Sequence, residues 1–416
     1  MIFNSINEKL FFYNIPVILF SLIPFFLITG PFLSDLSISL INLLFLIYCL
    51  KKKDFSYFKN KYFYFFIIFY GYLLFNSLIN NLNFDSLKIS FFYFRYGVFV
   101  FAIVALLNVD HKFLKYFFYC ILICFITLIL DGFYQYFFEE NILGIKKTSR
   151  TSSLFGDEKI LGSYLSRLWP IFFGLSILIY KKKNKFFSFF ILIFILSETL
   201  IFLSGDRSAF FYINLSAIFV IFFSKKLLKL RLFTLLTSIF LLSIISLIDP
   251  TAKERVFDKT ISQMNLQIDK EEKYIFSRHH NEIYISAYKM FLDNKILGVG
   301  VKNFRNFCSD ERYTKNILSC STHPHNTYLQ ILSETGIIGF LFLIFSLFYF
   351  CKYMIKHTIL KLRGNSYFTD FEICILSGLA IYLWPIIPTG NVFNNWINII
   401  MILNLPFLIW VKKAKI

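Results

Sequence analysis

Charged side chains are scarce in this chain of 416 residues. They make up 16% of it, whereas hydrophobic residues make up 57%, and the mean hydropathy is +0.63. In soluble domains about one residue in four is charged. This shortage excludes a soluble fold. The apolar runs, each roughly 17 to 25 residues long, match the thickness of a bilayer and indicate a multi-span helical membrane protein.

Acidic residues are especially few. The chain holds 25 of them against 43 Lys and Arg, which gives a formal net charge of +18. Lysines at the cytoplasmic ends of membrane spans produce such an excess, and no soluble basic domain is present, so we predict no nucleic-acid partner. The seven cysteines are scattered, and no C-x-x-C or H-E-x-x-H spacing occurs, so we predict neither a metal nor a cofactor.

Polar stretches long enough to separate domains are also rare. We therefore predict an all-α, polytopic membrane protein with about twelve transmembrane helices. The first apolar run, Leu10 to Leu27, is too long for a signal-peptide core and is followed by no small-residue cleavage site, so we expect a retained span. The predicted spans are residues 10–29, 33–50, 62–80, 91–108, 114–138, 161–180, 186–203, 208–224, 230–248, 336–352, 371–388 and 392–410.

One long polar segment, residues 249–335, interrupts the apolar runs between spans nine and ten. We call it the 249–335 loop and expect short helices in it. It divides the chain into residues 1–248 with spans one to nine, the loop itself, and residues 336–416 with spans ten to twelve and a tail. Cys308 and Cys320 both lie in this loop. They could form a disulfide if the loop lies outside the cytoplasm, and the sequence leaves their pairing open.

The connections between spans alternate in charge. One set is basic throughout and includes Lys51-Lys-Lys53, Lys225-Lys226 and Lys412-Lys413. The other set is polar, mixed or acidic and includes Ser204 to Ser208 and the 249–335 loop. The positive-inside rule assigns the basic set to the cytoplasm. Both termini are then cytoplasmic, and the 249–335 loop lies on the outer face.

Several arginines lie on or near that predicted outer face. Arg150 precedes span six, and Arg207 stands in the short connection Ser204-Gly-Asp-Arg-Ser208, which holds it close to the membrane plane. A guanidinium group is permanently charged and can bind two phosphate oxygens at once, which suits the diphosphate of a polyprenyl-linked substrate. A salt bridge between Arg207 and Asp206, or contact with lipid headgroups, is the alternative.

Arg95 and Arg167 lie one to two turns inside the outer ends of their spans. An arginine inside an apolar span is usually paired or functional, although it can also extend to the interface. Both readings stay open for Arg95, while for Arg167 we favour extension to the interface or structural pairing.

The 249–335 loop contains a predicted helix from Asn281 to Asp293, with Arg278 near its start and Gly298-Val-Gly300 after its end. Thr327-Tyr-Leu-Gln330 has capping-box spacing, so we expect a second helix to begin there and to continue through Gly336 into span ten. His325 would precede that helix. The helix dipole and nearby arginines would lower the pKa of its imidazole, and a neutral imidazole can act as a general base.

These residues resemble a known family. The string from His323 to Gly339, His-Pro-His-Asn-Thr-Tyr-Leu-Gln-Ile-Leu-Ser-Glu-Thr-Gly-Ile-Ile-Gly, is similar to the signature of the O-antigen ligase and polymerase family. Three shorter stretches also fit the family: Leu154-Phe-Gly-Asp157, Ser204-Gly-Asp-Arg207 and Ile296-Leu-Gly-Val-Gly-Val-Lys-Asn-Phe304. The chain departs from the family pattern at Lys295, where proline is common, and in the two histidines that follow Arg278.

The resemblance implies an inverting, metal-independent glycosyltransferase of the bacterial inner membrane. Such an enzyme transfers a glycan from undecaprenyl diphosphate to lipid A–core at the periplasmic face. His325 would be the catalytic residue. Arg207, Arg278, Arg150 and Arg95 would contact the diphosphate donor, and His323 and Asn326 would contact the acceptor or support the site.

Other functions are compatible with the same sequence features. An O-antigen polymerase or a protein O-oligosaccharyltransferase would use the same donor with a growing glycan or a protein as acceptor. A lipid flippase or transporter fits less well, because the predicted span centres are nearly free of charge and no internal repeat is visible.

Overall fold

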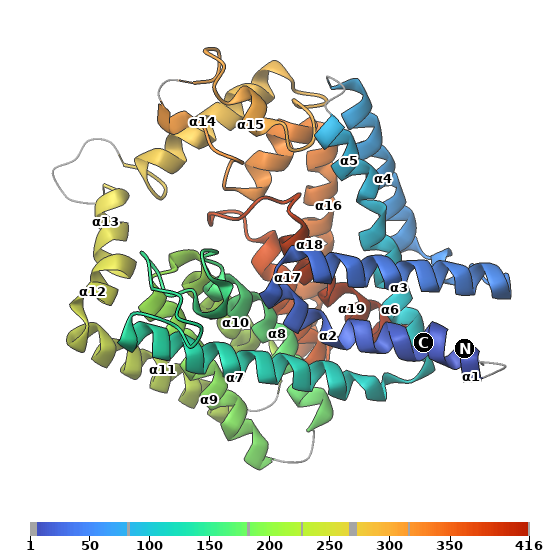
Figure 1. The fold of residues 1–416 in the computed structure, drawn as a ribbon, viewed down its shortest axis with the longest axis horizontal. Coiled ribbons are helices and arrows are strands. Elements are labelled where there is room, and N and C mark those ends of the chain that lie inside the picture. The colour runs from blue at the N-terminus through green and yellow to red at the C-terminus, as the bar shows by residue number, and fades with distance from the viewer. Residues whose placement is uncertain are drawn as a thin grey trace.

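The computed structural model describes residues 6–80, 84–180, 184–225, 228–265, 273–314 and 317–414. Within these ranges the chain forms helices and no strand (Figure 1), which confirms the predicted all-α class. The α-helices are α1 Ile6–Lys9, α2 Ile15–Thr29, α3 Pro31–Lys52, α4 Lys61–Ile79, α5 Phe84–Phe92, α6 Phe94–Val109, α7 Leu114–Phe138, α8 Leu161–Ile179, α9 Asn184–Ser204, α10 Arg207–Phe223, α11 Leu228–Ile248, α12 Pro250–Lys253, α13 Lys259–Gln263, α14 Arg278–Asp293, α15 Phe304–Phe307, α16 Thr327–Leu362, α17 Asp370–Leu383, α18 Asn395–Ile402 and α19 Asn404–Ala414.

Many of these helices are long and apolar enough to cross a membrane. Among the described residues eight stretches qualify, and three shorter apolar helices accompany them, so the protein is a polytopic membrane protein. The count of twelve spans stays a prediction. The eight stretches are Ile6–Thr29, Pro31–Lys52, Lys61–Ile79, Phe84–Val109, His111–Phe138, Leu161–Ile179, Thr327–Leu362 and Asn395–Lys412, and the shorter helices are Ser188–Ser204, Arg207–Phe223 and Leu232–Ile248.

Helix α8 lies at the centre of the bundle. It packs against α7, α9, α10 and α17, and most of its side chains are buried. Arg167 on this helix is only 3% exposed. Its guanidinium carbon lies 4.6 Å from the ring centre of Tyr212 on α10 and 4.7 Å from that of Tyr382 on α17. The buried cation is therefore held between two aromatic faces and does not extend to the interface.

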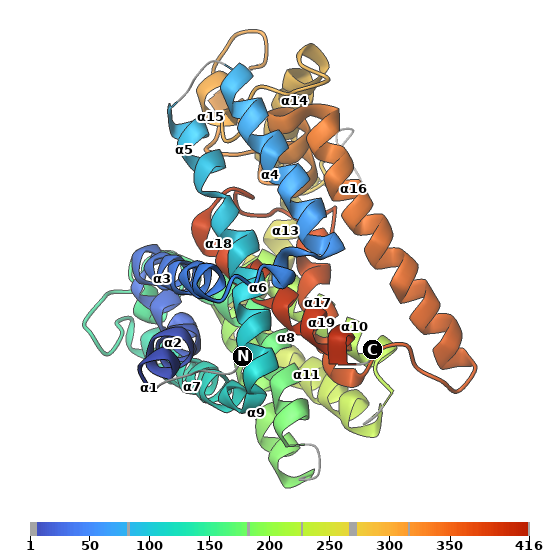
Figure 2. The same cartoon turned by 90° about the vertical axis from the view of Figure 1, so that its right-hand side faces the viewer.

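Three hydrogen bonds join segments that are distant in sequence. Lys412 Nζ donates to the Tyr62 hydroxyl over 3.3 Å, and the backbone N–H of Lys225 donates to Asp370 over 2.7 Å. The hydroxyl of Tyr212 on α10 donates to the Pro388 carbonyl over 3.0 Å. Figure 2 shows α14 and α15 at one end of α16, with the C-terminal end of α16 far from them. Helix α16 continues to Leu362, beyond residue 352 where the predicted span ten ends.

A kink in α16 joins the 249–335 loop to the membrane helices. Gly336 adopts φ 63° and ψ −167° within the helix. The carbonyl groups freed around the kink accept two backbone N–H groups: Val299 donates to Ser333 over 2.9 Å and Gly300 to Glu334 over 2.9 Å. In return, Ile337 donates to Lys295 over 2.8 Å. These reciprocal hydrogen bonds give a structural role to the Leu297-Gly-Val-Gly300 stretch and to the Thr335-Gly336 pair.

We predict that Gly336→Ala strongly destabilises the fold. A Cβ at this position would lie 2.2 Å from the carbonyl oxygen of Ile296, and the backbone conformation favours glycine. That conformation alone costs other residues about 1–3 kcal/mol. Thermal unfolding in detergent should show a lower midpoint. Gly71→Ala on α4 is the matched control, because nothing lies within 4 Å of its Cβ position, and it should unfold like the wild type. Equal midpoints for the two variants would contradict the role of the kink.

Candidate active site

His325 lies directly before α16, as expected. Its backbone has a positive φ of 54°, and its carbonyl accepts the Thr389 N–H over 2.8 Å. On the side chain, Nε2 lies 3.0 Å from the Ser321 hydroxyl oxygen. The following residue, Asn326, caps the helix by accepting the N–H groups of Tyr328 and Leu329. The predicted capping box beginning at Thr327 is therefore wrong by one position, since Thr327 is already helical.

His323 lies beside His325, with ring centres 4.0 Å apart. Its Nε2 lies 3.2 Å from the Thr389 carbonyl oxygen and its Nδ1 lies 3.0 Å from the Thr322 hydroxyl. Both ring nitrogens thus have protein partners, and Asn326 also donates to the Pro385 carbonyl over 2.8 Å. These bonds attach the motif to the loop between α17 and α18. For His323 and Asn326 the arrangement favours support over contact with an acceptor.

Both histidines of the motif are neutral at physiological pH. Burial, followed by the neighbouring His325, lowers the pKa of His323 to about 4. Burial also lowers the pKa of His325, and His279 adds to the effect. The direction agrees with the expectation for His325, but burial dominates, rather than the helix dipole and arginines. A neutral imidazole with one nitrogen free is the form that a general base requires.

A cationic pocket lies around the connection between α9 and α10. It has a volume of about 130 Å³. Arg207 donates to Thr260 over 3.1 Å and to Gln263 over 2.9 Å, so it pairs with neutral side chains and not with Asp206. The residues that line the pocket are Ser149, Arg150, Ser204, Gly205, Arg207, Arg255 and Lys259.

Two carboxylates contact cations of this pocket. Asp206 caps α10 by accepting the Ala209 N–H over 3.2 Å, and it lies 3.9 Å from an Arg150 guanidinium nitrogen. Glu254 lies 3.4 Å from Lys259 Nζ. Two carboxylates therefore stand against the four cations Arg150, Arg207, Arg255 and Lys259. The surplus of positive charge gives the pocket the character of an anion-binding site.

His280 lies beside the histidine motif. It is on α14, and its ring centre is 5.7 Å from that of His325. The charge of Arg207 is among the causes that lower the pKa of His280. Arg207 itself bonds to Thr260 and Gln263, so residues of the 249–335 loop and the start of α10 meet at the pocket.

The four predicted donor-binding arginines differ in their positions. Arg150 and Arg207 share the pocket. Arg278 is exposed at the first residue of α14, two positions from His280. Arg95 lies on α6, where its Nε is 3.0 Å from Asp35 on α3 and its guanidinium donates to Tyr96 over 3.2 Å. No contact between described residues links Arg95 to the pocket or to the histidines, so structural pairing is the reading that fits Arg95.

Sequence reasoning did not assign Arg255, Lys259 or His280 to the site. Arg255 and Lys259 come from the turns around α13, which fold back over the α9–α10 connection. No spacing of residues in the sequence predicts this contact, because it joins residues about fifty positions apart. For His280, a signal existed in the doubled histidine after Arg278, but its meaning depends on how α14 packs against α16.

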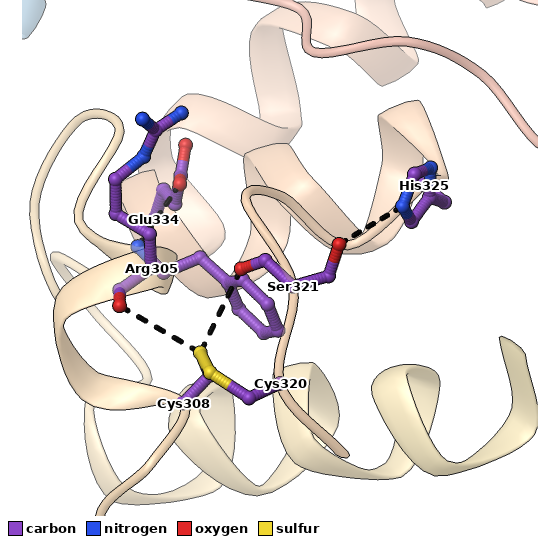
Figure 3. The surroundings of a disulfide bond; sticks show 7 residues. Arg305, Cys308, Cys320, Ser321, His325 and Glu334 are labelled. Carbon is purple, nitrogen blue, oxygen red and sulfur yellow. Dashed lines mark hydrogen bonds between the residues drawn. A yellow bond between two sulfur atoms is a disulfide. The ribbon is translucent and has the colours of Figure 1, made fainter. Parts of the chain in front are cut away.

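A disulfide between Cys308 and Cys320 completes the surroundings of His325 (Figure 3). The Cys308 sulfur lies 3.6 Å from the carbonyl oxygen of Ser321, whose hydroxyl contacts His325. On the same loop, Glu334 is fully buried and accepts the backbone N–H groups of Lys302 and Phe304, each over 3.1 Å. The pairing that the sequence left open is therefore present, and it holds the segment that carries Ser321.

The fold and this site define the class of protein: a polytopic membrane enzyme whose site combines neutral histidines with a cationic pocket. A family model described as O-antigen ligase matches residues 189–344, from within α9 to within α16, and confirms the predicted family. The protein thus carries an O-antigen ligase domain, and its general activity is glycan transfer of the ligase or polymerase type. Of the seven residues that the sequence predicts for the site, only Arg95 and Arg150 lie outside the matched segment. No curated protein matches the chain.

We predict that Cys308→Ser lowers thermal stability by about 3 kcal/mol, because a disulfide that closes a loop of this size restricts the unfolded chain by that amount. Differential scanning of the purified protein would measure the change. Cys351→Ser is the matched control, since Cys351 is free and exposed. Equal stability of both variants and the wild type would show that the bridge contributes nothing.

Proposed function

We propose that this protein transfers a glycan from undecaprenyl diphosphate to lipid A–core. The reaction takes place at the periplasmic face of the bacterial inner membrane, proceeds with inversion and needs no metal. The observation that carries the proposal is the cationic pocket around Arg207, which lies beside a cluster of neutral histidines. The family match supports the general type of reaction, and the site residues support the particular donor.

The pocket suits a diphosphate headgroup. Arg207 makes hydrogen bonds to the neutral Thr260 and Gln263 side chains, and phosphate oxygens can replace these acceptors and bind more strongly because they are charged. Arg150, Arg255 and Lys259 supply further positive charge on the same pocket. Because α10 begins at Arg207 and is apolar beyond it, a ligand there would have its lipid chain in the hydrocarbon region.

His325 suits the role of general base. It removes the proton from an acceptor hydroxyl, whose oxygen forms a bond to the anomeric carbon of the donor sugar. The bond from that carbon to the phosphate oxygen breaks, and its electron pair leaves with undecaprenyl diphosphate. The arginines of the pocket stabilise the charge on the leaving group. A single displacement of this kind inverts the anomeric configuration.

Two observations support a periplasmic site. A structural disulfide is typical of oxidising compartments, and Cys308 and Cys320 form one within the 249–335 loop. Among the described residues, segments of the basic loops contact one another, as the Lys412–Tyr62 and Lys225–Asp370 bonds illustrate. Both observations agree with cytoplasmic termini and with a domain division at residues 1–248, 249–335 and 336–416.

We predict that purified protein in lipid nanodiscs forms glycosylated lipid A–core from an undecaprenyl-diphosphate-linked glycan. A Ser/Thr peptide and a second lipid-linked glycan are offered in parallel, and mass spectrometry identifies the product. His325→Ala should form none, with unchanged insertion and thermal midpoint. A glycosylated peptide would indicate a protein transferase, and an extended lipid-linked glycan would indicate a polymerase. Near-normal transfer by His325→Ala would refute its role as base.

We also predict that kcat falls on the acid side only below pH 6.5, the ordinary pKa of imidazole. The lowered pKa of His325 keeps its base form populated as the pH falls through that value, so protonation and loss of activity come at lower pH. Initial rates at saturating donor from pH 4.5 to 8.5 would measure the pH at which kcat falls on the acid side. An apparent pKa at or above 6.5 would contradict the assignment.

A further inference from the structure

His280 has one ring nitrogen committed to the protein. Its Nδ1 lies 2.8 Å from the hydroxyl oxygen of Ser277, the N-cap of α14. That oxygen also accepts the backbone N–H of His280 over 3.3 Å. A serine hydroxyl carries one hydrogen, and Nδ1 is its only hydrogen-bond acceptor among the described residues. The geometry therefore assigns the hydroxyl as donor to Nδ1, and the ring proton to Nε2.

The Nε2–H group of His280 has no hydrogen-bond acceptor within the part of the chain that the structure describes. The ring is partly buried and lies between His325, 5.7 Å away, and Tyr284, 6.1 Å away. The adjacent His279, by contrast, is exposed. A partly buried donor without a protein acceptor, close to His325, is available to bind an anionic group of a ligand.

The electrostatic surroundings favour the neutral form of His280. Burial, then His325, His279 and Arg207 lower its pKa to about 4. The ring is therefore neutral near pH 7, so it is neither a charged anchor nor an effective acid, and at this basicity it is a poor base. A neutral imidazole whose Nδ1 is occupied can only donate through Nε2.

His280 lies 5.7 Å from His325, the proposed base, and the charge of Arg207 acts on it. In the proposed reaction this position corresponds to the junction between leaving group and reacting sugar. We propose that His280 donates Nε2–H to an oxygen of the phosphate that is bonded to the anomeric carbon of the donor. This inference rests on the proposed function. The hydrogen bond strengthens as the bond between carbon and phosphate oxygen breaks and the phosphate gains charge, while the proton stays on Nε2.

The test compares three substitutions of His280. The glutamine amide reaches about as far as Nε2, whereas the asparagine amide reaches only about as far as Nδ1. His280→Ala and His280→Asn should lower kcat by about 100-fold, the loss typical for one donor that stabilises developing charge. His280→Gln should stay within about tenfold of the wild type. The KM for the lipid-linked donor should change less than kcat, since the bond is strongest in the transition state.

His279→Gln is the matched control, because it removes an adjacent but exposed imidazole from the same helical turn. At pH 8 it should transfer glycan at the wild-type rate. Thermal midpoints of all variants report whether α14 still folds.

Three results would overturn the inference. They are full activity of His280→Ala, equal losses in the Ala, Asn and Gln variants, and a better rescue by Asn than by Gln. Absence of transfer by the wild-type protein itself would instead refute the proposed function and remove this inference with it. An active wild type with an active His280→Ala variant would leave the proposed function intact.

Discussion

The reciprocal backbone hydrogen bonds at the kink of α16 are the constraint on which the site depends. Val299 and Gly300 donate to carbonyls of Ser333 and Glu334, and Ile337 donates back to Lys295. Buried peptide groups are costly when unpaired, so these bonds hold the 249–335 loop firmly against a membrane helix. They fix the direction in which the first turns of α16 leave the bundle. His325 stands at the start of these turns, so its position depends on the same bonds.

Helix α4 reinforces the same junction from the other side. The Tyr72 hydroxyl donates to the Thr335 carbonyl, and the Asn76 amide donates to the Leu297 carbonyl. Side chains of α4 thus bond to backbone carbonyls on both sides of the junction, at Thr335 in α16 and at Leu297 in the 249–335 loop. A polar junction inside a largely apolar protein is specific, because a shifted register would leave these groups unpaired.

Charge is divided within the site between two kinds of side chain. His323, His325 and His280 lie within 4.0 to 5.7 Å of a neighbouring imidazole, and burial keeps them neutral. Arginine keeps its proton under the same conditions, so the positive charge gathers at Arg150, Arg207 and Arg255. The separation gives a site that can accept a proton at one end and bind an anion at the other. Protonated imidazoles at these distances would repel one another and the guanidinium groups.

The sequence by itself determined the membrane class, the helix of the 249–335 loop that ends at Asp293, and the place of His325 before α16. These features depend on apolar run length and on local capping, which neighbouring residues decide. Tertiary structure alone decided that Arg255, Lys259 and His280 join the site, that Arg95 pairs with Asp35, and that Asn326 rather than Thr327 caps α16. Each of the first two outcomes depends on helices that are distant in sequence and meet only after folding. Asn326 takes the capping position because its amide nitrogen donates to the Pro385 carbonyl in the loop between α17 and α18, while its side-chain oxygen accepts the N–H groups of Tyr328 and Leu329.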